Sequence, residues 1–110
     1  MTIFSKIINR EIPADIVFEN ERIIAIKDIA PKAPVHILIM PKKAIKDLQS
    51  VEEGDLALIG ECVKVAQSLA EEYGIEEGYR LLTNNGAPAG QSVFHLHFHL
   101  LGGRPLGVMC

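Results

Sequence analysis

Residues 93–101 alternate histidine with apolar residues, and this alternation constrains the fold more than any other part of the chain. Successive side chains of a β-strand point to opposite faces, so His95, His97 and His99 are expected on one face. The opposite face would then carry the apolar residues Phe94, Leu96, Phe98 and Leu100. The pattern predicts a strand over residues 93–101 that turns one side to an apolar core and presents its imidazoles on the other.

Three histidines on one face favour chemistry over packing. Histidine is suited to proton transfer, nucleophilic attack and metal binding near neutral pH. A single histidine in a strand is usually a hydrogen-bonded polar residue with no further role, but three on the same face would be a wasteful way to build a core. We therefore interpret this face as a candidate functional site.

Length and charge narrow the class of protein. The 110 residues predict one domain, 1–110, near the size at which oligomerisation often completes the burial of apolar surface. Eleven Lys and Arg residues against fourteen Asp and Glu residues give a net charge of −3. Because binding of a nucleic-acid polymer requires a basic surface, a small nucleotide is favoured over a polymer as a phosphate-bearing ligand.

The cysteines and the apolar runs indicate in which cellular compartment the protein is expected. No run approaches the roughly 18 apolar residues of a membrane span, and the first residues lack the long apolar stretch of a secretory signal. Cys62 is expected to lie in a helix and to face the protein core, and Cys110, the last residue, is expected to be mobile. No disulfide framework is therefore predicted. We expect a protein of the reducing cytoplasm with no membrane partner.

The remaining pattern predicts helices and strands in one unit without repeats. Apolar residues from Ile3 to Ile12 indicate a short helix or turn that ends before Pro13. Ser50 and Glu53 form a capping-box pattern, which predicts a long helix that starts there and ends at Gly74. Strands are predicted over residues 15–18, 22–28, 35–40 and 78–83, with a stiff loop at 31–34.

The long helix carries two apolar lines at helical spacing. One comprises Leu56, Ile59, Val63, Ala66, Ala70 and Tyr73, and the other comprises Leu58, Cys62, Val65 and Leu69. A stripe of this width fits a helix that packs on the sheet and on a second subunit, or a helix buried deeply in a monomer.

The loop at residues 84–92 delivers the chain to the histidine segment. Asn, Gly and Ser are ordinary loop formers, but here they directly precede the histidines. Gly90 allows close approach of the backbone to a ligand, and Ser92 offers a hydroxyl group. Exposed N–H groups of such a turn can also hold an anion beside the imidazoles.

The segment at residues 95–101 resembles the signature of the histidine triad superfamily. Further blocks in register are similar to its Hint branch, the histidine triad nucleotide-binding proteins: residues 3–8, 11–14, 28–31, 34–36, 41–43, 78–80, 90–93 and 101–104. The resemblance implies an α+β, HIT-like fold with a mainly antiparallel five-stranded sheet, two helices and a homodimer that extends the sheet. It also implies a purine nucleoside 5′-phosphoramidate hydrolase of the adenosine 5′-monophosphoramidase type, with no required cofactor or metal.

The resemblance also assigns roles to residues. His97 would be the nucleophile, oriented by the carbonyl of His95, with His36 and His95 as a relay behind it. His99 would stabilise the phosphate, and Ser92 or a neighbouring histidine would pass a proton to the departing amine. The ligand would be a purine mononucleotide: AMP, GMP, a phosphoramidate or an aminoacyl adenylate. Its expected contacts are Ile3, Phe4, Ile7, Ile26, Ile29, Asp28 at the ribose, Asn84, Gly90, Gln91, Ser92, Val93, His97 and His99.

Three other interpretations stay open on the residues. The alternating histidines with His36 could form a Zn²⁺ site, or bind zinc only adventitiously. The protein could be a nucleotide-binding adaptor with incidental turnover, or a related enzyme that hydrolyses dinucleoside polyphosphates. Two departures from the family pattern, a tail without tryptophan at residues 105–110 and Ile26 in place of an aromatic residue, leave the leaving group and the base preference open.

Overall fold

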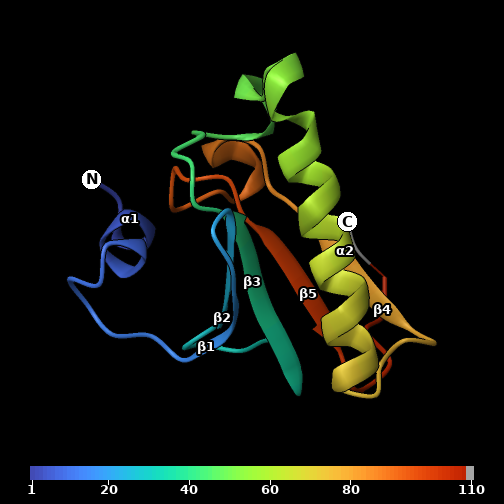
Figure 1. The fold of residues 1–110 in the computed structure, drawn as a ribbon. Helices are drawn as coiled ribbons and strands as arrows, with labels where there is room; N and C mark the ends of the chain where they lie inside the picture. Colours follow the sequence, from blue (N-terminus) through green and yellow to red (C-terminus); the bar gives the residue numbers. More distant parts are fainter. Residues whose placement is uncertain (109–110) are drawn as a thin grey trace.

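A computed structural model describes residues 1–108 of the chain, so the expectation for Cys110 lies outside the described residues. Two helices and five strands alternate with short 3-10 turns (Figure 1). The main elements are α1 (Ile3–Ile8), β1 (Ile16–Glu19), β2 (Ile23–Lys27), β3 (Val35–Pro41), α2 (Leu56–Glu72), β4 (Tyr79–Leu82) and β5 (Phe98–Gly102). The 3-10 turns are η1 (Leu48–Ser50), η2 (Glu53–Asp55) and η3 (Ala87–Ala89).

The five strands form one antiparallel sheet in the order β1-β2-β3-β5-β4. In the centre, β3 pairs with β5 so that His36 lies opposite Leu101 and Leu38 lies opposite His99. His36 and His99 are therefore diagonal neighbours on one face, within reach of each other's side chains. The strands predicted from sequence are confirmed, with ends that differ by one or two residues except at the histidine segment.

The two faces of the sheet are covered by different helices. On one face, α2 packs Cys62, Val65, Ala66, Leu69 and Ala70 against apolar side chains of the central strands. On the other face, a smaller cluster joins α1 to the sheet: Phe4, Ile7, Ile24, Ile26, Leu38 and Met40. Figure 1 shows α2 across β4 and β5, and α1 on the far side of the sheet, near β2 and β3. The large core therefore lies under α2, and the face under α1 combines a smaller apolar cluster with the polar groups described below.

The histidine segment differs from its prediction. The strand covers only Phe98–Gly102, and residues 93–97 form a bend without strand pairing, so His95 and His97 precede the strand. Phe94, expected on the buried face, is 40% exposed. The cause is a change of backbone direction: the Leu96 N–H donates to the carbonyl of Ile45 at 2.7 Å, outside the ladder of the sheet. The alternation still buries Leu96, Phe98 and Leu100 in the core under α2.

The start of the long helix was predicted wrongly, and its end is confirmed. Ser50 does not cap α2, because its N–H and hydroxyl both donate to the Asp47 carboxylate and close the separate turn η1. A second turn, η2, follows before α2 begins at Leu56. At the other end, the N–H of Gly74 donates to the Glu71 carbonyl and that of Ile75 donates to the Ala70 carbonyl. This pair of bonds is a Schellman motif, which ends the helix at the predicted glycine.

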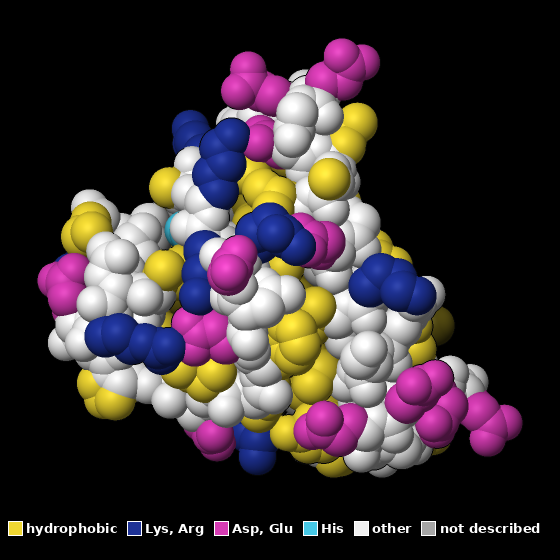
Figure 2. Space-filling view, in the orientation of Figure 1, with side chains coloured by type: hydrophobic (Ala, Val, Ile, Leu, Met, Phe, Trp, Pro, Cys, Tyr) yellow, Lys and Arg dark blue, Asp and Glu magenta, His cyan; other side chains and the backbone are white. Residues whose placement is uncertain are grey.

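The outer surface of α2 is only partly apolar. The second predicted line and the alanines of the first face the core, whereas Leu56 and Val63 are exposed. Figure 2 shows acidic side chains beyond both ends of α2 and very little histidine on this side of the molecule. Among residues 1–108, no helix has the length and apolar character needed to cross a membrane.

Candidate active site

The backbone carbonyl of His95 determines which ring nitrogen of His97 carries the proton. Its Nδ1 lies 2.7 Å from the carbonyl oxygen of His95. A carbonyl can only accept a hydrogen bond, so Nδ1 carries the proton and Nε2 of the neutral ring is a bare lone pair. Thr83 follows β4, and its hydroxyl donates to the backbone carbonyl of His97 at 2.7 Å. This bond ties the backbone of His97 to the end of β4.

His95 lies behind this pair and is almost entirely buried, with 1% of its surface exposed. Its Nε2 donates to the carbonyl of Pro41 at 2.7 Å. Its Nδ1 has no hydrogen-bond partner within residues 1–108. The ring of Phe4 meets His97 edge-on, with ring centres 4.9 Å apart, and His95 at 6.3 Å. His95 therefore braces the site from inside, with its ring held by β3 and walled by α1.

His36 and His99 form a second pair, in which a backbone N–H, and not a carbonyl, lies behind the first ring. The backbone N–H of Lys32 donates to Nδ1 of His36 at 3.0 Å, so the proton of the neutral His36 ring lies on Nε2. That Nε2 is 2.9 Å from Nδ1 of His99 and donates to it. Nδ1 of His99 is then an acceptor, and the proton of His99 lies on Nε2. The pair presents an N–H donor where His97 presents a lone pair.

The relay expected from the family resemblance is corrected by these contacts. His36 was expected to act with His95 behind His97, but it hydrogen-bonds to His99. The reason is the register of β3 and β5, which places His36 and His99 diagonally on one face, while His95 has already left the strand. The expected carbonyl of His95 behind His97 is present.

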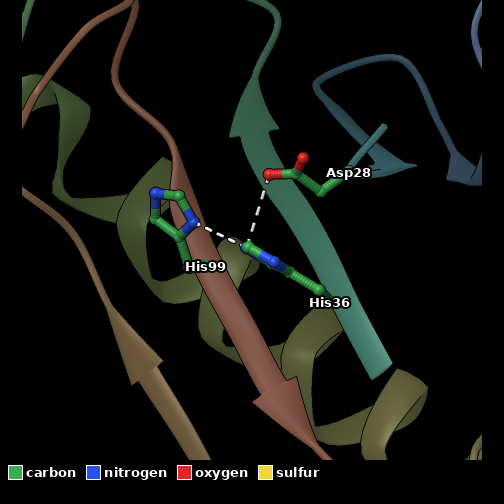
Figure 3. A group of neighbouring side chains, drawn as sticks. All are labelled: Asp28, His36 and His99. Carbon is green, nitrogen blue, oxygen red and sulfur yellow. Dashed lines mark hydrogen bonds and ion pairs between the residues drawn. The ribbon is translucent and has the colours of Figure 1, made fainter. Parts of the chain in front are cut away.

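Asp28 joins the second pair from the end of β2. One carboxylate oxygen, Oδ2, lies 3.4 Å from Nε2 of His36, and the other accepts the N–H of Ala30 at 2.8 Å. Figure 3 shows His36 between Asp28 and His99, with the three side chains pointing toward one another. Asp28, expected at the ribose, thus contacts His36, which in turn hydrogen-bonds to His99, the residue expected at the phosphate.

Burial keeps the four rings neutral. Loss of solvation lowers the pKa values of His36, His95 and His97 below their ordinary range. Loss of solvation, with the neighbouring His97 and His36, lowers the pKa of His99 to about 4. The rings of His97 and His99 lie with their centres 5.1 Å apart. A bare lone pair and an N–H donor therefore stand side by side at neutral pH.

The loop of residues 84–92 leads directly into the histidine segment and is held in place by the side chain of Gln91. The Gln91 side chain accepts the N–H of Gly86 and donates to the carbonyls of Lys46 and Val93. The oxygen and both amide protons of this side chain thus bond to the protein, and the ligand contact expected for Gln91 stays a prediction. Gly90, at φ +101°, adopts a conformation that favours glycine, and the Asn84 amide lies against it. Ser92 is exposed beside them.

The apolar residues expected around a base divide into two groups. Phe4, Ile7 and Ile26 are buried in the cluster beneath α1, and Val93 packs against that cluster. Ile3 is half-exposed and Ile29 is 98% exposed. The buried group contributes to the core and could also line a base-binding site, whereas Ile3 and Ile29 lie on the surface.

Sequence reasoning missed three groups that hold the histidines in place. The N–H of Lys32, the carbonyl of Pro41 and the hydroxyl of Thr83 each make one of the contacts described above. Lys32 and Pro41 act through peptide groups, which no side-chain pattern reveals. Thr83 alone had a readable signal, a hydroxyl at the end of a predicted strand next to the predicted loop.

Asp28, His36 and His99 also have the residue types of a metal site, with ligand atoms within 4.8 Å of one another. Nε2 of His36 could bind a cation only after its proton moved to Nδ1. That proton would then face the N–H of Lys32, two donors in one contact. The donor set therefore fits a hydrogen-bonded chain better than a cation.

A sheet that carries an alternating-histidine segment on the face opposite its long helix defines a histidine triad protein. A family model described as the HIT domain matches residues 9–106. The chain belongs to the HIT domain family.

Similar proteins cover almost the whole chain. A HIT-like protein of Chlamydia pneumoniae is 55% identical over 109 residues, 99% of each chain. The purine nucleoside phosphoramidase of Escherichia coli is 50% identical over 109 residues, 98% of this chain and 92% of that protein. The structure of a HIT family hydrolase from Clostridium thermocellum superposes with a TM-score of 0.94 at 50% identity, covering 98% of this chain and 95% of that one. The expected HIT-like fold is confirmed, and the dimer stays a prediction.

Proposed function

We propose that the protein hydrolyses purine nucleoside 5′-phosphoramidates through a covalent intermediate on His97. The observation that carries the proposal is the 2.7 Å contact between Nδ1 of His97 and the His95 carbonyl, which leaves Nε2 as a bare lone pair. The similarity to the phosphoramidase of Escherichia coli and to HIT family hydrolases supports a hydrolase and, more specifically, this substrate class.

The chemistry follows from the two kinds of ring. Nε2 of His97 attacks phosphorus in line, a P–N bond to histidine forms, and the P–N bond to the amine breaks. The amine leaves with one added proton, which the exposed Ser92 hydroxyl or a neighbouring histidine passes to it. Water then attacks phosphorus, the His97 bond breaks, and the water proton returns to solution. One displacement becomes two, and the histidine is regenerated.

The second pair of histidines would serve the phosphate. The Nε2–H of His99 donates to a phosphate oxygen as negative charge develops there, and the backbone amide of Val93 adds a further donor. The N–H groups of Gly90 and Gln91 already donate to Ala87 and Gly86 within the loop. Asp28 accepts the ribose hydroxyls, while Phe4, Ile7 and Ile26, with the exposed Ile3 and Ile29, flank the base. The chain of donors ending at His99 needs no metal, and zinc bound here would be adventitious.

The test uses metal-free protein and an adenosine 5′-phosphoramidate that carries a fluorescent amine. Wild type should release the amine, and His97→Ala should release none while still binding AMP in calorimetry. Release by His97→Ala at the wild-type rate would contradict the nucleophile. No release by either protein, with AMP bound, would favour the adaptor. Cleavage of a dinucleoside polyphosphate in preference to the phosphoramidate would favour the related hydrolase. Turnover that appears only after Zn²⁺ is added back to the metal-free protein would favour a zinc enzyme.

We also propose that the protein is a homodimer built on the outer side of α2. Glu61 reaches across to Arg22 at the start of β2, so Val63, 200° further round the helix, projects to the other side. Val63 and Leu56, a full two turns earlier, form an exposed apolar strip there. A second copy would bury this strip and bring together edge strands of the two sheets.

Sedimentation tests the dimer. Wild type should sediment as a dimer, and Val63→Glu should sediment as a monomer, because a buried unpaired carboxylate opposes association. Ser68→Glu adds the same charge to the exposed surface of α2 nearer β1 and should leave the mass unchanged. A wild-type monomer would refute the dimer.

A further inference from the structure

The turn after β5 contacts the loop that precedes His36. A guanidinium nitrogen of Arg104, Nη2, donates to the carbonyl of Lys32 at 2.8 Å. Its Nη1 donates to the neighbouring carbonyl of Pro105, also at 2.8 Å, which orients the guanidinium. Arg104 thus holds the one residue whose N–H meets Nδ1 of His36.

The backbone reinforces this contact one residue earlier. Gly103 has φ +97°, and a Cβ atom built there would lie 2.9 Å from Cβ of Pro34. Real Cβ atoms do not approach so closely, so only glycine allows the turn to lie against the loop. The loop of residues 31–34 is therefore held from the C-terminal side at two points, Lys32 and Pro34.

The loop in turn determines where the proton of His99 lies. The Lys32 N–H forces the proton of His36 to Nε2, and this N–H forces the proton of His99 to its own Nε2. If Lys32 turned away, only the more distant Asp28 carboxylate, 3.4 Å from Nε2 of His36, would favour a proton there, and His36 could carry its proton on Nδ1 instead. Its Nε2 would then accept, His99 would donate from Nδ1, and Nε2 of His99 would lose its proton. The two rings must change together, because two lone pairs or two protons cannot face each other in one contact.

We propose that Arg104 is a positioning residue for His99, acting through Lys32 and His36 to hold the tautomer that donates from Nε2. Its effect on turnover rests on the proposed function, since the donor matters only if a phosphate meets it. Its effect on the tautomer does not. Arg104 touches none of the four imidazoles, so its role is to fix a proton and not to contact the substrate.

The experiment reads the tautomer directly in the ligand-free protein. Nitrogen-15 NMR distinguishes Nδ1–H from Nε2–H in each neutral ring. Wild-type His99 should be Nε2–H, and Arg104→Ala should raise its Nδ1–H fraction severalfold. Hydrogen exchange of the Lys32 amide should accelerate about tenfold, as the loop opens locally. Arg104→Lys, which keeps a donor, should restore part of both signals.

Arg80 provides the matched control. Its guanidinium also donates to a backbone carbonyl of the C-terminal segment, that of Gly107, so its loss removes a bond of the same kind away from Lys32. Arg80→Ala should leave the His99 tautomer unchanged. Gly103→Ala, which pushes on Pro34, should change it in the same direction as Arg104→Ala and gives an independent disturbance of the loop.

Two results would overturn the proposal. An unchanged His99 tautomer in folded Arg104→Ala would remove the connection, and an equal change in Arg80→Ala would show general loosening of the C-terminal segment. Kinetics then separate this inference from the proposed function. A wild type without phosphoramidase activity refutes that function and leaves the NMR result standing, whereas an active wild type should show a lower kcat in Arg104→Ala with little change in KM.

Discussion

The pair of His95 and His97 and the pair of His36 and His99 present opposite chemical groups, although all four residues are histidines. His97 and His95 point their inner nitrogens at backbone carbonyls, so each ring keeps its proton inside, and His97 turns a lone pair outward. His36 starts from a backbone N–H, so it and His99 keep their lone pairs inside, and His99 turns a proton outward. The comparison teaches that the backbone group behind a ring, and not the ring itself, decides between nucleophile and donor.

The sharpest way to break the comparison is to trap the intermediate. Acid quenching of wild type during turnover of an adenosine phosphoramidate should give protein with one nucleotidyl group added, seen by intact-mass spectrometry. His97→Gln should give none, because it lacks the lone pair. His99→Gln, the matched change in the other pair, should still give the adduct, more slowly. An adduct on His97→Gln, or on another histidine, would refute the division of roles.

A smaller loss of kcat is expected when the pair of His36 and His99 is disturbed and His97 is left intact. His36→Ala should lower kcat about tenfold to a hundredfold, because His99 then lacks the partner that fixes its proton. Steady-state kinetics measure this, and AMP affinity serves as the control for an intact site. A loss as large as that of His97→Gln would mean that His36 acts on the nucleophile after all.

Asp28→Asn should weaken AMP binding by about tenfold, about 1.4 kcal/mol, through loss of a charged acceptor for the ribose. Calorimetry with AMP and with 2′,3′-dideoxy-AMP distinguishes the ribose from other causes, since the variant should bind both nucleotides alike. If Asp28→Asn weakens both equally, the carboxylate acts through His36 and does not bind ribose.

The pH dependence of stability tests the donor ring without any ligand. The folded protein holds His99 neutral down to about pH 4, whereas the unfolded chain protonates it near its ordinary value of 6.5. The unfolded state binds more protons between these values, so stability should fall as pH is lowered from about 6.5 to about 4 and the slope should vanish above that window. Urea unfolding at pH 5 and 7.5 measures this, with a shallower slope expected for His99→Gln. Equal slopes would show that His99 is not held neutral by the fold.

Features of the fold and the site that depend on side-chain type could be predicted from the sequence, and those that depend on contacts of backbone groups could not. The alternation identified His97 and His99, and the apolar pattern placed the sheet face and the end of α2 at Gly74, because side-chain type determines both. The start of α2 was wrong because Asp47 competes for Ser50. The partner of His36 was wrong because the bend before β5 removes His95 from the strand, and a hydrogen bond from Leu96 to Ile45 outside the ladder is invisible in the sequence.

The buried side chain of Gln91 has a consequence for the thermodynamics of binding. With 4% of its surface exposed, it joins the peptide groups of Gly86, Lys46 and Val93, three points on separate stretches of the chain. The conformational entropy of the loop is therefore lost when the protein folds and not when a ligand arrives. A ligand at the histidine face meets a preorganised wall, so its association should be fast and its binding entropy should carry little contribution from loop ordering.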